Sequence, residues 1–310
     1  MAQYPDLILG IDGGGSHTIA VLAERASNGR ILGRGEAGPS NIQSVGDAAL
    51  RALEEAIAGT FANTGRARGS VAAAVLGLAG VDHPDAVKVI RAWAERFGLA
   101  DRLKVENDSV LLLAAGTPQG WGLAVVAGTG SIAFARNRDG RMERSGGWGY
   151  VLGDEGSAYS LGLGGLRAVA RASDGSAPAT ILTRTLLARM NLREPLEMIE
   201  AVYRGDWDRA RIATLAPLVG EAAESGDAVA AGIVALQARL LAETVVAAAR
   251  KVELPRDRVP LALTGGPILN GQHYREHFLS ALRKLDLNPD PVALVHDPVE
   301  GAIRIARELA

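Results

Sequence analysis

Cysteine is absent from the 310 residues of this chain. Without thiols the protein can form no disulfide, no thiolate zinc site, no iron–sulfur cluster and no cysteine nucleophile. The same absence is typical of a protein that works in a reducing compartment. We therefore expect a cytoplasmic protein whose chemistry depends on oxygen and nitrogen groups.

Lysine is scarce, and its positions exclude one common kind of phosphate site. The four lysines all lie outside glycine-rich loops, at Lys88, Lys104, Lys251 and Lys284. A Walker-type phosphate loop needs the sequence Gly-Lys-Ser/Thr, so no such loop is present. If the protein binds phosphates, backbone N–H groups and a metal ion must compensate their charge.

Charge of one sign and long apolar runs are also missing. The formal net charge is −2 with both signs scattered along the chain, which gives no basic face for nucleic acid. No window of 18 apolar residues is free of glycine, proline or charge, and no positive region precedes the first apolar run. We expect a soluble, unexported protein that binds a small molecule and has neither nucleic acid nor a membrane as a partner.

A glycine-rich hairpin is the first positive feature. Residues 7–11 and 18–23 are apolar strand formers. The turn between them begins with Gly13, Gly14 and Gly15. Glycine permits positive φ and lets backbone N–H groups approach an anion, while Ser16 adds a hydroxyl donor. Asp12, at the end of the strand, is placed to hold a hydrated Mg²⁺ that shields phosphates. A tight hairpin without a ligand is the alternative interpretation.

The order of predicted elements indicates an α/β protein with an internal duplication. The elements predicted after the hairpin are a strand over 30–36, a helix over 45–63, a strand over 71–78, a helix over 84–97 and a short strand over 104–107. From residue 123 the hairpin pattern with a glycine-rich tip starts again, which predicts a second, similar domain. Residues 154–251 are expected to be a helical insertion in that domain, after which strands and helices alternate.

Two further glycine-rich turns strengthen the phosphate interpretation. They are Gly128-Thr129-Gly130-Ser131, at the tip of the second hairpin, and Thr264-Gly265-Gly266, after a buried strand. The two hairpin tips suit the two ends of a polyphosphate, and the third turn suits the ribose or base of a nucleotide. Together the three turns predict an ATP-dependent phosphotransferase with two domains that close over a central cleft. Ordinary turns without a ligand are the alternative.

Asn107 and Asp108 lie between a predicted strand and a predicted helix, at the junction of the two repeats. Asp108, with Ser109, is a candidate helix cap, because aspartate fills that position well. Asp108 is also a candidate general base, since phosphoryl transfer to an alcohol needs a carboxylate that orients the hydroxyl and accepts its proton. The two roles are compatible.

The stretch 145–158 combines glycines, an aromatic ring and two carboxylates. Gly147 and Gly149 flank Trp148, whose flat face suits the C–H face of a sugar ring, and the carboxylate of Asp154 suits its hydroxyls. The alternative is that Asp154 and Glu155 are acids in the first turn of the following helix, where the helix dipole favours them.

Two polar segments are interpreted as solvated surface. His273 and His277 belong to a His-x-x-Glu-His pattern that resembles an inverted zincin motif, but no third ligand is evident, and a solvated helix face is the expected structure. The arginine-rich stretch 204–211 is expected to be solvated as well.

These motifs resemble the N-acetylglucosamine kinase branch of the ATPase family named for the benzoyl-CoA and 2-hydroxyacyl-CoA reductase activators, within the actin and hexokinase superfamily. The motifs that carry the resemblance are Asp12 to Ser16, Asn107-Asp108, Gly128 to Ser131, Gly146 to Ala158, Thr264 to Pro267 and Asp297 to Ala302. The resemblance implies two ribonuclease-H-like (actin-like ATPase) domains, spanning 1–115 and 116–296. It also implies that a final helix over 297–310 packs back on the first domain, and that the protein is a homodimer.

The resemblance also assigns roles to residues. Asp108 would be the catalytic base. Sugar contacts would come from Asn41, Asn107, Asp108, Ser131, Gly147, Trp148, Gly149 and Asp154. Nucleotide contacts would come from Gly13, Gly14, Gly15, Ser16, Thr129, Gly130, Gly265 and Gly266. Asp12 would hold Mg²⁺ through water, so the expected cofactors are ATP and Mg²⁺.

The expected activity is transfer of the γ-phosphate of ATP to the 6-hydroxyl of N-acetylglucosamine. The activator role within the family needs interface cysteines, which this chain lacks. Trp148-Gly149 and Asp154-Glu155 favour the acetylated sugar over glucosamine, although glucosamine or another amino sugar stays an alternative. A non-catalytic, nucleotide-switched sugar sensor is the alternative of another class, against which the presence of Asp108 argues.

Overall fold

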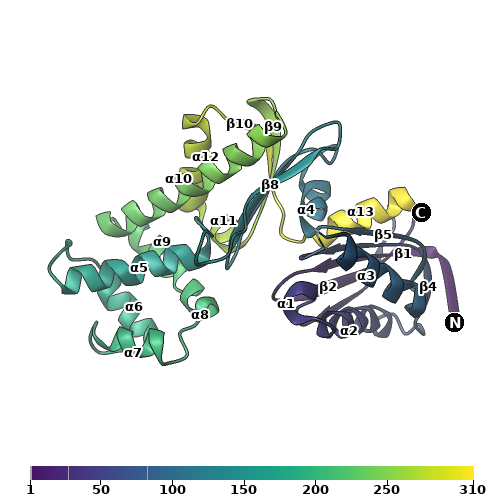
Figure 1. The fold of residues 1–310 in the computed structure, drawn as a ribbon, viewed down its shortest axis with the longest axis horizontal. Helices are drawn as coiled ribbons and strands as arrows, with labels where there is room; N and C mark the ends of the chain where they lie inside the picture. The colour runs from purple at the N-terminus through teal and green to yellow at the C-terminus, as the bar shows by residue number, and fades with distance from the viewer. Residues whose placement is uncertain (1, 27, 82) are drawn as a thin grey trace. The chain divides into compact units, whose positions relative to one another are not determined.

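The computed structural model describes residues 2–26, 28–81 and 83–310. The chain forms two compact units (Figure 1). Unit 1 comprises residues 1–120 and 297–310, and unit 2 comprises residues 121–296. The chain therefore leaves unit 1, builds unit 2, and returns to unit 1 for its last helix.

Unit 1 is built on a mixed sheet with the strand order β3-β2-β1-β4-β5. Its strands are β1 (Ala2–Gly13), β2 (Thr18–Glu24), β3 (Ile31–Ala37), β4 (Gly69–Leu78) and β5 (Ala100–Glu106). The pairs β1–β2 and β2–β3 are antiparallel, whereas β1–β4 and β4–β5 are parallel. The first of these pairings confirms the predicted glycine-rich hairpin, with Gly13 opposite Thr18.

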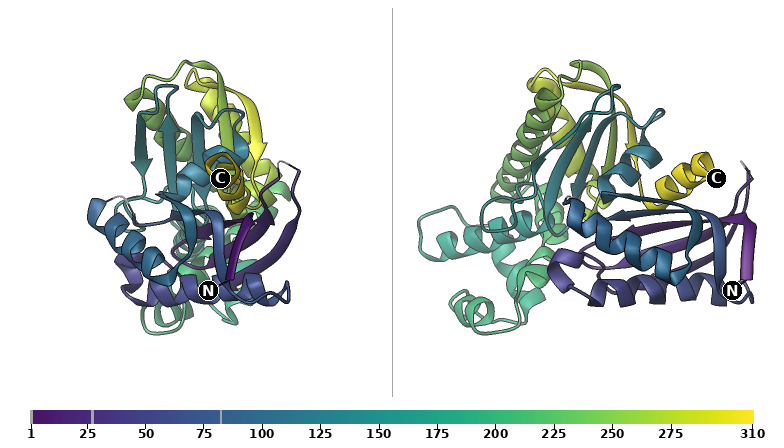
Figure 2. Two further views of the ribbon diagram at one scale, coloured as in Figure 1. Left: turned by 90° about the vertical axis from the view of Figure 1, so that its right-hand side faces the viewer. Right: turned by 45° about the vertical axis from the view of Figure 1, so that its right-hand side comes forward.

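Helices cover both faces of this sheet. They are α1 (Ile42–Val45), α2 (Ala48–Ala62), α3 (Pro84–Phe97), α4 (Asp108–Gly116) and α13 (Val299–Leu309). Leu7, Leu9 and Ile11 of β1 belong to the core under α2 and α3, whereas Ile8 faces a second core with α4 and α13. This alternation follows from the two-residue period of a strand. In Figure 2, α13 lies in yellow against the sheet that begins the chain.

Unit 2 repeats the same sheet. Its strands are β6 (Gly122–Ala127), β7 (Ser131–Arg136), β8 (Met142–Gly146), β9 (Asp257–Thr264) and β10 (Asn288–Leu294). The order β8-β7-β6-β9-β10 and the strand directions match those of unit 1. Both halves are thus α/β units of one topology, which confirms the predicted fold class. The central cleft predicted from the sequence stays a prediction.

The connection from β8 to β9 is long and helical. It runs through α5 (Ala158–Ser173), α6 (Leu182–Met190), α7 (Glu197–Tyr203), α8 (Arg209–Ala213), α9 (Ala216–Glu224) and α10 (Ala228–Lys251). The unit also contains α11 (Gly266–Asn270) and α12 (Gln272–Lys284). Within the described chain, α10 alone is long and apolar enough to span a membrane by length and composition. Its residues Leu241 and Val245 are fully buried in the core of unit 2, and core helices of that kind pass the same test.

One predicted helix is divided in the structure. The sequence predicted a single helix over 45–63, but α1 ends at Val45 and α2 begins at Ala48. Gly46 separates them with φ of 55°, a left-handed conformation that an α-helix cannot continue. The amphipathic part of the prediction corresponds to α2.

Candidate active site

The first glycine turn is tightly fastened within unit 1. The N–H of Gly14 donates to the carbonyl of His17 at 2.9 Å, and the N–H of Ser40 donates to the carbonyl of Gly14 at 3.1 Å. The hydroxyl of buried Thr18 donates to the carbonyl of Gly38 at 2.7 Å. Ser16, by contrast, is exposed. The turn is therefore held in place while its tip is open to a ligand.

Positive φ is not the reason for these glycines, so that part of the sequence interpretation was wrong. Gly13, Gly14 and Gly15 do not appear among the glycines with positive φ. Gly13 lacks room instead, because a Cβ there would collide with the side chains of Ser40 and Leu78. A Cβ at Gly15, by contrast, would meet no surrounding atom within 4 Å. Close packing therefore explains the glycine at 13. At 15 the remaining explanation is that a missing side chain leaves the backbone accessible to a ligand.

Carboxylates gather at the end of β1. Burial, followed by the charges of Asp108 and Asp297, raises the pKa of Asp12 to about 7, against the weaker opposing effect of Arg34. Arg34 donates through Nη1 to Asp297 and through Nε to Glu36 at 3.2 Å. The other carboxylate oxygen of Asp297, Oδ1, is buried without a hydrogen-bond partner. Unit 1 therefore holds a cluster of acidic oxygens with one arginine at its side.

This donor set fits a hydrated Mg²⁺. Mg²⁺ prefers oxygen ligands and usually keeps several waters while one or two carboxylates and substrate phosphates hold it. Among the described residues, no three His, Asp or Glu side chains are grouped so that they could hold a metal ion by themselves. The carboxylate of Asp12 and the orphaned oxygen of Asp297 suit such partial, water-mediated coordination.

Asn107, and not Asp108, caps α4. The Oδ1 atom of Asn107 accepts from the N–H of Ser109 at 3.0 Å and from its hydroxyl at 2.6 Å. The predicted cap at Asp108-Ser109 was therefore wrong by one residue, because the amide side chain one position earlier occupies that role. Asp108 is the first helical residue, where the helix dipole favours a negative charge.

The predicted unit 1 residues meet at one edge of the sheet. Asp12 pairs with Gly77 of β4, and Gly77 pairs with Glu106 of β5, so the carboxyl ends of these parallel strands lie side by side. Asn41 caps α1 through the N–H of Gln43 at 3.0 Å, and its side chain packs on Gly80, just past β4. In open α/β sheets ligands bind at this edge.

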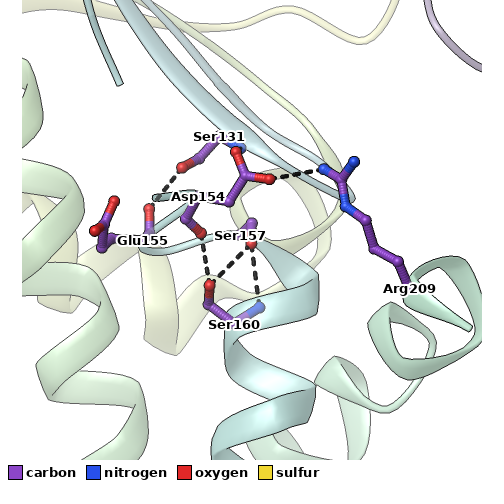
Figure 3. Close-up of polar contacts among 6 residues, drawn as sticks. All are labelled: Ser131, Asp154, Glu155, Ser157, Ser160 and Arg209. Carbon is purple, nitrogen blue, oxygen red and sulfur yellow. Dashed lines mark hydrogen bonds and ion pairs between the residues drawn. The ribbon is translucent and has the colours of Figure 1, made fainter. Parts of the chain in front are cut away.

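A second group of predicted residues meets in unit 2. Asp154 accepts the N–H of Ser131 on Oδ1 at 3.1 Å, and the hydroxyl of Ser131 donates to the carbonyl of Glu155 at 2.7 Å. Figure 3 shows these residues together, with Ser160 bonded to the carbonyl of Asp154 at 2.6 Å. Asp154 is only 3% exposed. The alternative that Asp154 and Glu155 are first-turn acids was wrong, because α5 begins at Ala158 behind its cap Ser157.

Arg209 is a residue that the sequence interpretation missed. Its Nη2 donates to Oδ2 of Asp154 at 2.7 Å, and its guanidinium lies 5.4 Å from the ring centre of Tyr150. The stretch 204–211 was expected to be solvated surface, but this one arginine extends from α8 to a buried carboxylate (Figure 3). Sequence spacing carries no signal for such a pair, since 55 positions separate the partners.

The aromatic part of the sugar motif is open to solvent. Trp148 is 67% exposed, and the guanidinium of Arg144 lies 5.4 Å from its ring centre. Gly147 and Gly149 have φ of 70° and 82°, so here glycine does supply the left-handed backbone. The loop thus leaves most of the tryptophan accessible, although Arg144 lies over the ring.

The remaining turns lie in unit 2, and the third of them borders a cavity at Gly266. Gly265 has φ of 102°, and a Cβ there would collide with the carbonyl of Ala127 at the end of β6. Thr129, in the neighbouring turn, is exposed. A largely apolar cavity of about 390 Å³ opens beside Gly266. Its lining includes Leu161, Pro217, Gly220, Val234, Asn270 and Tyr274. Its size and apolar walls suit a flat ring system.

The histidine pair lies outside both groups. The Nε2 atoms of His273 and His277 are 3.3 Å apart on α12. Burial, together with the charge of His273, lowers the pKa of His277. In the described chain no third metal-binding side chain joins them. The pair contributes nothing to the sites described above.

Comparison with known proteins gives a consistent result. The model of the BadF/BadG/BcrA/BcrD ATPase family matches residues 9–306. An N-acetylmuramic acid/N-acetylglucosamine kinase of Clostridium acetobutylicum is 33% identical over 305 residues, which is 97% of this chain and 98% of that protein. An N-acetyl-D-glucosamine kinase of Dictyostelium discoideum is 34% identical over 85% of this chain and 86% of its own length.

A solved structure shows the same fold. A candidate N-acetylglucosamine kinase from Chromobacterium violaceum is 30% identical and superposes with a TM-score of 0.73. The match covers 96% of this chain and 98% of the other.

Proposed function

Because the chain belongs to the BadF/BadG/BcrA/BcrD ATPase family, we propose that it is an ATP-dependent kinase that phosphorylates the 6-hydroxyl of N-acetylglucosamine. Two relatives that match most of the chain carry N-acetylglucosamine kinase in their names. The observation that supports the proposal most strongly is the hydrogen bond between Ser131 and Asp154. It places buried oxygen atoms in unit 2 that can accept hydrogen bonds from sugar hydroxyls. Asp108 lies in unit 1, at the start of α4 after the carboxyl end of β5.

Asp108 is the proposed general base. Its carboxylate would accept the proton of the 6-hydroxyl as the oxygen attacks the γ-phosphorus and the bond to the β-phosphate oxygen breaks. Asn107 is the N-cap of α4, and Asp108 follows it as the first residue of the helix. ADP and the 6-phosphate of the sugar are the products.

The proposed sugar contacts in unit 2 centre on Asp154. Asp154 and the Ser131 hydroxyl would accept hydrogen bonds from ring hydroxyls, Trp148 would stack on the ring, and Gly147 and Gly149 would offer backbone groups. Asn41 and Asn107 are the proposed amide contacts from unit 1. The exposed face of Trp148 is consistent with a surface that a ligand covers.

The proposed nucleotide contacts are backbone groups and the cavity. Phosphates would lie against the turns 13–16 and 128–130, with no lysine needed. They would accept from backbone N–H groups other than those of Gly14 and Gly128, which donate to the carbonyls of His17 and Gly130. The adenosine would occupy the cavity beside Gly265 and Gly266. Mg²⁺, held through water by Asp12, would neutralise charge on the β- and γ-phosphates when bound.

A coupled assay of ADP release tests the proposal. We expect release that depends on N-acetylglucosamine and on Mg²⁺, with a lower kcat/KM for glucosamine. N-acetylmuramic acid should be tested as well, because one relative is named for it. ADP release that does not depend on any of the sugars would instead support the alternative that the protein is a nucleotide-switched sugar sensor. The cytoplasmic location and the homodimer stay predictions, and sedimentation would test the second.

The adenosine cavity makes a prediction for Gly220. This residue lines the cavity, and a Cβ there would enter open space, so Gly220→Leu should fill the cavity without disturbing α9. We expect the Kd for ATP to rise at least about tenfold, since lost burial of a ring costs more than about 1.4 kcal/mol. Calorimetry with ATP measures the change. The matched control is Gly232→Leu, an exposed helical glycine with equally open surroundings, which should leave the Kd for ATP unchanged.

A further inference from the structure

Asp154 is a buried carboxylate whose two oxygens are both engaged. Oδ1 accepts the N–H of Ser131, and Oδ2 accepts Nη2 of Arg209. The side chain of Asp154 is 4% exposed, whereas that of Arg209 is 38% exposed. A charge buried to this degree needs a partner, because removing one member of such a pair leaves the other uncompensated.

Three separate segments meet at this carboxylate. Gly130 lies so close that a Cβ there would stand 2.5 Å from Nη2 of Arg209 and 2.8 Å from Oδ2 of Asp154. The guanidinium also lies over Tyr150. The absence of a side chain at Gly130 is therefore what lets the arginine reach the aspartate. This gives Gly130 a function that the phosphate interpretation of its turn did not include.

The two bonds leave the carboxylate little freedom. With one oxygen fixed by backbone N–H and the other by a guanidinium, rotation about the last side-chain bond would break at least one contact. Each oxygen still has a second lone pair that can accept from a ligand. The ion pair has no net charge, so it favours neutral hydroxyl donors over an anionic group.

We propose that Arg209 is a positioning residue for the sugar: it holds the Asp154 carboxylate in the orientation that accepts ring hydroxyls. The proposal rests on the proposed sugar site at Asp154. Arg209 acts through Asp154 and takes no part in phosphoryl transfer. Its loss should therefore weaken the binding of the sugar in the ground state and in the transition state by the same amount. The Kd and KM for sugar should rise, and kcat should stay nearly unchanged.

Three variants test this role. Arg209→Gln, which keeps hydrogen-bonding capacity without charge, should raise the Kd for N-acetylglucosamine about 10- to 100-fold, the range expected for a lost charged hydrogen bond. Arg209→Lys should recover part of this loss. The matched control is Arg211→Gln on the same helix, where the arginine is 55% exposed and pairs with exposed Asp206 at 3.2 Å, and it should change the Kd less than twofold.

Two further measurements separate positioning from a merely structural role. The Kd for ATP should stay within error in Arg209→Gln, even though the melting temperature should fall because buried Asp154 loses its charged partner. In an Asp154→Asn background, Arg209→Gln should add little, because both changes act on one interaction. An unchanged sugar Kd in Arg209→Gln, or full additivity with Asp154→Asn, would overturn the proposal. Failure of the proposed function would show itself earlier, as absence of sugar-dependent ADP release in the unmodified protein.

Discussion

Asp108→Asn should lower kcat by about 10²- to 10⁴-fold, the range of general-base contributions, while the Kd values for sugar and ATP change little. The proton leaves the sugar hydroxyl only on the way to the transition state, so the loss belongs to kcat. The structure makes this variant informative. Asn107 is the N-cap of α4, and asparagine at 108 keeps the shape and most of the hydrogen-bonding capacity of aspartate, so stability should change by less than about 1 kcal/mol.

The measurement combines calorimetry for both ligands with steady-state turnover. Glu106→Gln is the matched control, because it removes a carboxylate two positions away that pairs with Lys104 at 3.0 Å. That variant should keep kcat within a few-fold of the unmodified protein. Near-normal turnover in Asp108→Asn would contradict the role of Asp108 as the general base. Asp12, Asp154 and Glu155 would then be the candidate bases.

Asp12→Asn should abolish most Mg²⁺-dependent turnover and yet stabilise the free protein above neutral pH. A metal ion contributes several kcal/mol to transition-state stabilisation, so we expect kcat to fall at least about 100-fold. The stability gain follows from the pKa of Asp12, which burial and neighbouring carboxylates raise from 3.8 to about 7. The folded protein holds this proton more tightly than the unfolded chain does.

The sign of the pH dependence follows directly. Between pH about 4 and about 7 the folded state binds more protons at Asp12, so the free energy of unfolding falls as pH rises through this window. Above it the ionised carboxylate destabilises the fold by at most about 4 kcal/mol, and partial solvent access reduces this to about 1–3 kcal/mol. Asparagine cannot ionise, so the variant avoids that loss.

Urea unfolding without Mg²⁺, at pH 4.5 and pH 8.5, measures the effect. The variant should exceed the unmodified protein in stability at pH 8.5 and differ much less at pH 4.5. Asp6→Asn, on an exposed position of the same strand, is the control and should show no such pH dependence. A variant that is less stable at pH 8.5 would contradict the prediction.

The strands and hairpins could be predicted because their signals are local. Leu7, Leu9 and Ile11 alternate with residues that face the opposite core, and a glycine turn stands where the chain reverses. The second hairpin follows the same pattern, so the duplication was visible before the common strand order was known. Local composition indicated Asp154 as a candidate and the family resemblance added Ser131, although their direct hydrogen bond was not predicted.

What the sequence could not reveal depends on distant partners. Gly13 is crowded by Ser40 and Leu78, neighbours that only the folded sheet provides. Arg209 has the composition of a surface helix, and its partner Asp154 belongs to another segment. Asn107 and Asp108 are both good capping residues, so the choice between them required the backbone geometry of α4.

The return of α13 to unit 1 has a consequence during protein synthesis. This helix covers Ile8 and Val21, which leave the ribosome near the start of translation, whereas residues 297–310 follow only after all of unit 2. At about 5–20 residues per second, the synthesis of unit 2 (residues 121–296) alone takes on the order of 10–35 s. Throughout that interval one face of the first sheet lacks its native cover. The nascent chain therefore offers a surface for chaperone binding that the finished protein hides.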